Sequence, residues 1–133
     1  MSADISEQRA AEILKIVDEK LGYNRMPIYR AYNYLISQGL TKKEALLDIW
    51  GEAQFDYFDR LYEEEIKSSK NINNEKIEFF LQKMAEITGY NRNKEIEEEY
   101  RREVRRHKEG YNLIKDVWDN IMDLYMSDML EMK

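Results

Sequence analysis

The 133-residue sequence contains no cysteine, one proline and one histidine. Without cysteine the chain has no disulfide, no thiol nucleophile and no cysteine-bound zinc or iron–sulfur cluster. One proline and five glycines supply too few turn residues for a β protein, whereas the abundant Glu, Lys, Leu, Ile and Met favour helices. These scarcities predict an all-α protein.

Long hydrophobic runs are also missing. No stretch approaches the roughly 20 apolar residues that a membrane-spanning helix needs. Residues 1–4 contain neither the basic nor the apolar region of a secretion signal. We therefore expect a soluble cytoplasmic protein with no membrane partner, and the 43% of hydrophobic residues is enough for a folded core.

Positive charge is the scarcer sign, because 21 Lys and Arg face 27 Asp and Glu for a net charge of −6. Nucleic-acid backbones are normally bound by basic surfaces, so nucleic acid is not expected as a partner. A helix-turn-helix interpretation of residues 28–62 fails for the same reason, since its recognition helix would present Asp56, Asp59 and Glu63 to DNA.

The most specific feature of the sequence is an internal repeat. Residues 22–25 (GYNR) recur 67 positions later as residues 89–92, and after one inserted residue the segment 48–57 (DIWGEAQFDY) aligns with 116–125 (DVWDNIMDLY). We therefore predict a six-helix domain made from an internally duplicated three-helix unit, because one such unit buries too little surface to be stable alone. The predicted repeats are residues 1–66 and 72–133, packed as one domain and joined by the linker 67–71.

Apolar residues spaced three and four apart predict the six helices. The first runs from Asp4 or Ser6 to Leu21, the second from Pro27 to Gly39, the third from Thr41 to about Ile66, the fourth from about Ile77 to Gly89, the fifth from Asn93 to Lys108, and the sixth from Tyr111 to about Glu131. Thr41 and Glu44 form a capping box, and Gly51 is expected to kink or split the third helix. The highly charged fifth helix has only a thin apolar stripe, Ile96, Tyr100 and Val104.

The single histidine limits nucleophile–histidine chemistry to one position. His107 follows Arg102 with four residues between them. This spacing resembles the arginine–histidine signature of the higher eukaryotes and prokaryotes nucleotide-binding family, helical proteins that include many metal-independent ribonucleases. The resemblance covers six residues and implies proton transfer by His107 and phosphate binding by Arg102. The other interpretation is a solvated helix whose acidic first half and basic last half complement the helix dipole, with Glu103 placed where it would repel a phosphate.

No residue pattern predicts a metal or a cofactor. The consecutive acids 63–65 and 97–99 fan around a helix and cannot converge on one ion, and Asp116, Asp119 and Asp123 are interpreted as a solvated acidic stripe. A glycine-rich phosphate loop and a calcium-binding loop are both absent from the sequence. We therefore predict no catalytic, cofactor-binding or metal-binding residues, and expect that the chain is not an enzyme.

The sixth helix carries the main interaction hypothesis. Met122, Met126 and Met129 recur at helical spacing, and methionine suits adaptable apolar contacts in a core or at a partner surface. On the second helix, Tyr29 and Tyr34 are expected to be exposed, either as part of an interaction surface or as rim residues.

These observations predict a non-enzymatic, small, acidic helical protein that acts through protein–protein interaction, with another protein or with itself as a homodimer. In character the sequence resembles small phage or mobile-element accessory proteins, including inhibitors that occupy a nucleic-acid groove of another protein. Two alternatives remain open: a metal-independent helical ribonuclease using Arg102 and His107, and a structural subunit of a larger assembly.

Overall fold

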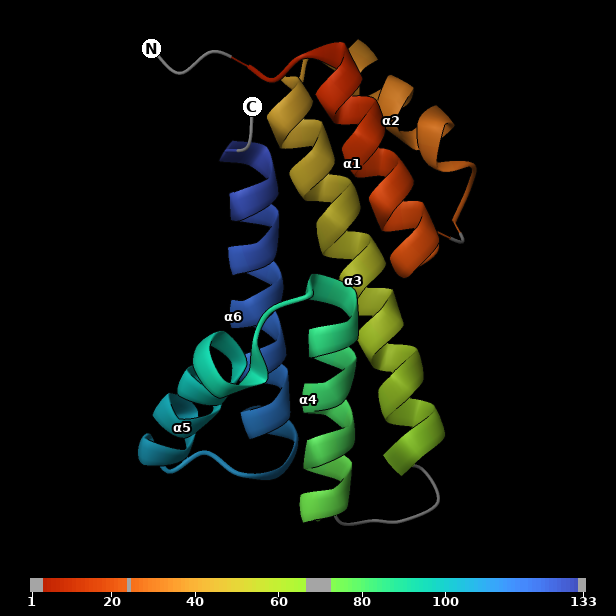
Figure 1. The fold of residues 1–133 in the computed structure, drawn as a ribbon. Helices are drawn as coiled ribbons and strands as arrows, with labels where there is room; N and C mark the ends of the chain where they lie inside the picture. The colour runs from red at the N-terminus through yellow and green to blue at the C-terminus, as the bar shows by residue number, and fades with distance from the viewer. Residues whose placement is uncertain (1–3, 24, 67–72, 132–133) are drawn as a thin grey trace. The chain divides into compact units, whose positions relative to one another are not determined.

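A computed structural model describes residues 4–23, 25–66 and 73–131 of the chain (Figure 1). These residues form six α-helices and one π-helical segment, and no strand occurs among them, so the predicted all-α class is confirmed. The predicted linker 67–71 lies outside the described residues. The helices are α1 (Glu7–Lys20), α2 (Ile28–Ser37), α3 (Lys42–Ile66), α4 (Asn74–Thr88), the π-helical segment η1 (Arg92–Ile96), α5 (Glu97–Arg105) and α6 (Gly110–Glu131).

Helices α1 and α4 begin in the same way. The Ser6 hydroxyl accepts a hydrogen bond from the backbone N–H of Arg9 at 3.1 Å, and the Asn73 side-chain oxygen accepts one from the N–H of Lys76 at 3.0 Å. Each side chain takes up an N–H group that has no partner within the first helical turn. Ser6 is one of the two residues, with Asp4, at which the sequence predicted the first helix to begin.

The first turn of α3 is capped twice. Thr41 N–H donates to Glu44 at 2.9 Å and Glu44 N–H donates to Thr41 at 3.2 Å, which confirms the predicted capping box. The Asp4 carboxylate also accepts from the N–H groups of Lys42 and Lys43, at 2.7 and 3.0 Å. Burial acts to raise the pKa of Asp4, but these N–H groups outweigh it and lower that pKa below its ordinary value.

Helix α2 ends at a glycine in the left-handed conformation. Gly39 has φ +95°, its N–H donates to the carbonyl of Ile36 at 3.0 Å, and the N–H of Leu40 donates to the carbonyl of Leu35 at 3.3 Å. This pair of hydrogen bonds is the Schellman motif, in which a left-handed residue satisfies the last carbonyls of a helix.

Two predictions about the helices need correction. Gly51 does not split α3, which runs unbroken from Lys42 to Ile66. The predicted fifth helix is a π-helical turn followed by α5, and its inward face differs from the predicted stripe: Ile96 and Glu103 are buried at 0% and 1% exposure, whereas Val104 is 43% exposed. Seven residues make almost two α-helical turns, so Glu103 rather than Val104 shares the face of Ile96.

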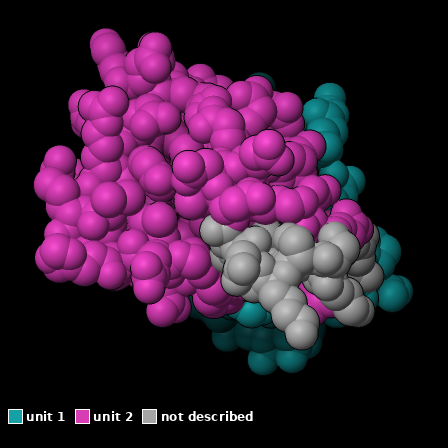
Figure 2. Space-filling view, turned by 90° about the horizontal axis from the view of Figure 1, so that it is seen from below, with its two compact units in different colours: residues 1–59, 126–133 teal, residues 60–125 magenta. Residues whose placement is uncertain are grey.

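The chain divides into two compact units, coloured separately in Figure 2. Unit 1 comprises residues 1–59 and 126–133, and unit 2 comprises residues 60–125. The two long helices therefore contribute to both: α3 supplies its last turns to unit 2, and α6 supplies its last turns to unit 1. These boundaries differ from those of the predicted repeats, and the duplication stays a prediction at this point.

One tryptophan lies in the core of each unit, Trp50 at 2% exposure in unit 1 and Trp118 at 0% in unit 2. From α3, unit 1 buries Ala45, Leu46, Ile49, Trp50, Ala53 and Phe58. From α6, unit 2 buries Leu113, Ile114, Val117, Trp118, Ile121 and Met122. Of the helices in the described part of the chain, none has the length and apolar character needed to cross a membrane.

Candidate interaction surface

The methionines of α6 are inside the protein. Met122 lies in the core of unit 2, and Met126 and Met129 lie in the core of unit 1, with exposures of 0%, 0% and 3%. Their spacing is typical of a core face as well as of an interface, and the sequence could not separate the two. Their predicted part in an interface stays a prediction, and they present almost no surface to a partner in this conformation.

Helix α2 presents large apolar side chains to solvent. Tyr29 and Tyr34 are 50% and 61% exposed, Ile36 is 36% exposed, and Met26, just before the helix begins, is 43% exposed. Neither Met26 nor Ile36 was predicted as part of an interaction surface. The opposite side of the helix packs into unit 1 through Ile28, Ala31 and Tyr32. Tyrosine is enriched where proteins bind one another, because its ring gives a large contact area at a small cost in conformational entropy.

Helix α3 carries a second exposed apolar row in unit 1. Leu47 and Phe55 are 48% and 47% exposed, and Gly51 lies midway between them, four residues from each. Residues four apart form a ridge along a helix surface, so we call Leu47, Gly51 and Phe55 the α3 ridge. The sequence did not predict Leu47 to be exposed, because an exposed leucine on an amphipathic helix looks the same in sequence as a buried one.

An acidic row, Glu44, Asp48, Glu52 and Asp56, runs beside the α3 ridge at the same spacing. Arg25 pairs with the last two, through contacts of 3.5 Å to Glu52 and 3.1 Å to Asp56. The hydroxyl of Tyr23 donates to Glu52 at 3.0 Å. Burial first, and then the hydrogen bond to Glu52, raise the pKa of Tyr23 to about 12.

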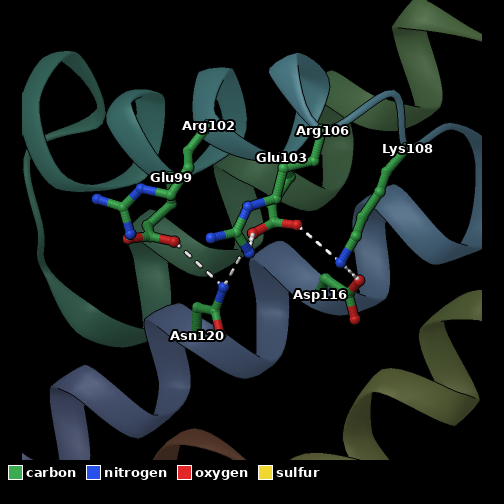
Figure 3. Close-up of polar contacts among 7 residues, drawn as sticks. All are labelled: Glu99, Arg102, Glu103, Arg106, Lys108, Asp116 and Asn120. Carbon is green, nitrogen blue, oxygen red and sulfur yellow. Dashed lines mark hydrogen bonds and ion pairs between the residues drawn. The ribbon is translucent and has the colours of Figure 1, made fainter.

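Unit 2 contains a charged cluster between α5 and α6 (Figure 3). The buried Glu103 carboxylate lies 2.9 Å from Lys108 Nζ, in an ion pair whose geometry is not that of an aligned hydrogen bond. Arg106 and Asn120 lie 3.4 and 3.5 Å from its other oxygen. Lys108 also pairs with Asp116, and the carboxylates of Asp116 and then Glu103 raise the pKa of Lys108 above its ordinary value. The burial of Glu103 was not predicted from the sequence.

Arg102 and His107 make different contacts, Arg102 in an ion pair with Glu99 and His107 in the turn that ends α5. The Arg102 guanidinium pairs with Glu99 at 2.7 Å, and Glu99 also accepts from Asn120 at 3.2 Å. Arg102 therefore already has a carboxylate partner, with which a phosphate would have to compete. No contact between Arg102 and His107 is found within the described residues.

His107 closes α5 in the left-handed conformation, with φ +62°. Its N–H donates to the carbonyl of Val104 at 2.9 Å, and the N–H of Lys108 donates to the carbonyl of Glu103 at 3.3 Å. These are the hydrogen bonds that Gly39 organises at the end of α2. A non-glycine residue is uncommon in this conformation, so His107 occupies a turn position that glycine would fill with less strain.

A hollow of about 590 Å³ lies along α4 in unit 2. It is lined by Asn74, Glu75, Glu78, Phe79, Gln82 and Arg92. Its one cation, Arg92, pairs with Glu78 and lies 3.6 Å from Glu97. The paired guanidinium leaves little net charge to attract an anion.

Residues 4–23, 25–66 and 73–131 include no group of three or more His, Asp or Glu side chains placed to hold a metal ion. In comparisons with protein-family models, with curated proteins and with solved structures, nothing matches this chain.

Proposed function

We propose that this chain is a non-enzymatic protein that acts by binding another protein or a second copy of itself. The observation that carries the proposal is the exposed apolar surface of unit 1. Among the described residues, nine large apolar side chains are exposed, and six of them belong to unit 1. Exposed apolar residues scattered singly are ordinary, whereas an apolar patch marks an interaction site. Four of the six fall within residues 26–36, and the other two lie four residues before and after Gly51 on α3. The six are Met26, Tyr29, Tyr34, Ile36, Leu47 and Phe55.

The proposal extends to the origin of the fold, an internal duplication of a three-helix unit. Three features recur at the offsets predicted from the sequence. The caps Ser6 and Asn73 lie 67 positions apart and accept equivalent hydrogen bonds. Gly22 and Gly89, with φ +78° and +72°, also lie 67 apart, and the Schellman residue Gly39 lies 68 positions before His107.

The cores support the duplication in the same way. Each buried residue of α3 listed above for unit 1, from Ala45 to Ala53, has a buried residue of α6 68 positions later. The boundary after Asp59, moved by 68 positions, falls within two residues of the boundary after Tyr125. The division into units therefore repeats along with the sequence.

The narrower descriptions of the protein remain proposals that rest on composition. They are a cytoplasmic location, homodimer formation, and a role as a phage or mobile-element accessory protein or inhibitor. The acidic balance of −6 is compatible with a partner that has a basic surface.

Site-specific photo-crosslinking tests the proposal. A photoreactive phenylalanine analogue in place of Tyr29 or Tyr34 is expected to give a discrete crosslinked product, of twice the chain mass for self-association or of another mass for a different partner. The matched control is the same substitution at Tyr111, an aromatic residue of unit 2 that is 41% exposed. Equal products from all three positions, or no product from Tyr29 and Tyr34, would contradict binding through α2.

A further inference from the structure

The α3 ridge contains a glycine for which the chain itself shows no need. Gly51 lies in the interior of α3, and a Cβ at this position would meet nothing within 4 Å. Glycine inside a helix costs about 1 kcal/mol relative to alanine. Neither close packing within the protein nor a left-handed backbone accounts for it, whereas a small residue between two exposed apolar side chains allows another backbone to approach closely.

The acidic row beside the ridge is only partly balanced within the chain. Like charges four residues apart on a helix repel one another. Arg25 offsets Glu52 and Asp56, but Asp48 is exposed and has no ion pair among the described residues. Asp59, exposed at the end of the ridge, also lacks one. Lys or Arg side chains of a partner could therefore pair with Asp48 and Asp59 along this face, since neither has an ion pair within the described residues.

The second half of the sequence provides an internal comparison. The positions 68 residues after the α3 ridge are occupied by Lys115, Asp119 and Asp123, and Lys115 pairs with Asp119 at 2.6 Å. The core positions of α3 and α6 correspond, yet this row is charged in α6 and apolar in α3. The core of such a helix therefore does not require Leu47, Gly51 and Phe55 on its surface.

We infer that the α3 ridge binds a basic amphipathic helix of another protein, with the apolar stripe of that helix packed over Gly51 and its Lys or Arg side chains paired with Asp48 and Asp59. This inference names the partner class for the proposed protein-binding function and rests on that function. A second copy of the chain is disfavoured as the occupant, because two copies packed on this face would bring their acidic rows together.

The probe is a synthetic helical peptide of about 20 residues, since helices shorter than about 12–15 residues are marginal in water. It carries Leu and Ala on one stripe and Lys on both flanks. One comparison peptide has the same composition in scrambled order, and another has Glu in place of Lys. Calorimetry or fluorescence anisotropy is expected to give binding of the amphipathic Lys peptide about tenfold tighter than that of either comparison peptide.

Two variants locate the site. Gly51→Gln fills the space over the ridge without touching the core, so this variant is expected to fold at least as stably as the wild type. Its affinity for the peptide is expected to be about tenfold lower. Asp48→Lys is expected to weaken peptide binding more than Asp18→Lys does. Asp18→Lys is the control, because it makes the same charge change at an exposed position of α1. Circular dichroism and thermal unfolding verify that each variant is folded.

The outcomes separate this inference from the proposed function. The ridge site is overturned if the scrambled peptide binds as tightly as the amphipathic Lys peptide, or if the Lys peptide binds Gly51→Gln as tightly as the wild type. In that case the crosslinks from Tyr29 and Tyr34 still test the proposed protein-binding function independently. Peptide binding that Gly51→Gln and Asp48→Lys both weaken supports the ridge site.

Discussion

The Glu103 carboxylate, at 1% exposure, depends on Lys108 for its charge balance, so Lys108→Leu is expected to destabilise the protein. Removing one partner of a buried ion pair commonly costs about 3–5 kcal/mol, because the other charge stays desolvated. In the Lys108→Leu variant, Arg106 at 3.4 Å and Asn120 at 3.5 Å still contact the carboxylate. We therefore expect the unpaired Glu103 to cost about 2 kcal/mol.

The first half of the chain indicates how the same site can be built without charge. Leu35 and Leu40 lie 68 positions before Glu103 and Lys108 and share the backbone hydrogen bond that closes α2. A Schellman motif usually has an apolar contact between these two positions. The double variant Glu103→Leu/Lys108→Leu is therefore expected to be as stable as the wild type or about 1 kcal/mol more stable.

Urea unfolding followed by tryptophan fluorescence at pH 7 measures both effects, since Trp50 and Trp118 are buried and report on the two units. A cost of about 2 kcal/mol corresponds to a midpoint lower by about 1 M urea for a chain of this size. Lys94→Leu is the control, because exposed Lys94 has no buried carboxylate partner in the described residues. The reasoning is refuted if Lys108→Leu unfolds at the midpoint of Lys94→Leu, or if the double variant is less stable than Lys108→Leu alone.

Three further expectations follow from the described contacts. His107→Gly should raise the free energy of unfolding by about 0.5 kcal/mol, because glycine adopts the left-handed conformation without strain; unfolding in urea measures it with His107→Ala as control, and loss of an RNA-cleaving activity in both variants would favour the ribonuclease alternative instead. Asp4→Ala should be less stable than the wild type at pH 7, where the lowered pKa of Asp4 keeps it ionised, and the difference should shrink below about pH 4 as the carboxylate takes up a proton. Tyr23 has a pKa raised to about 12, so its stabilising effect is complete below about pH 10 and is lost as the pH rises toward 12. The midpoint temperature of thermal unfolding should therefore fall more steeply across this pH range for the wild type than for Tyr23→Phe.

Local signals in the sequence were sufficient for most helix boundaries. The capping box at Thr41 and the helix end at Gly89 each depend on a few neighbouring residues, and both were predicted. The charged fifth helix was predicted less well, because the choice between Val104 and Glu103 as the inward residue depends on what packs across from α5. Sequence alone gives a buried glutamate no advantage over a buried valine, whereas Lys108 and Asn120 supply one in the folded chain.

The candidate sites illustrate the same physical limit. The methionines of α6 and Leu47 of α3 belong to equally regular apolar patterns, yet Met126 is fully buried and Leu47 is 48% exposed. Periodicity identifies a helical face but not whether the protein's own core covers that face. The tyrosines of α2 were expected to be exposed because they fall off the inward stripe of a short helix, and Tyr34 has the largest exposure of the large apolar side chains among the described residues.

The two halves differ most where the fold depends least on side-chain identity. At the corresponding core positions Trp50 and Trp118 are unchanged, because a residue of that volume cannot be replaced without a cavity or a clash. At the left-handed positions after α2 and α5, Gly39 and His107 differ in side chain but form the same backbone hydrogen bonds. On the surface, the apolar α3 ridge corresponds to a charged row in α6. If duplication produced the chain, a charged row at these positions is compatible with the core of such a helix, and the apolar ridge of α3 is best explained by a contact outside the chain.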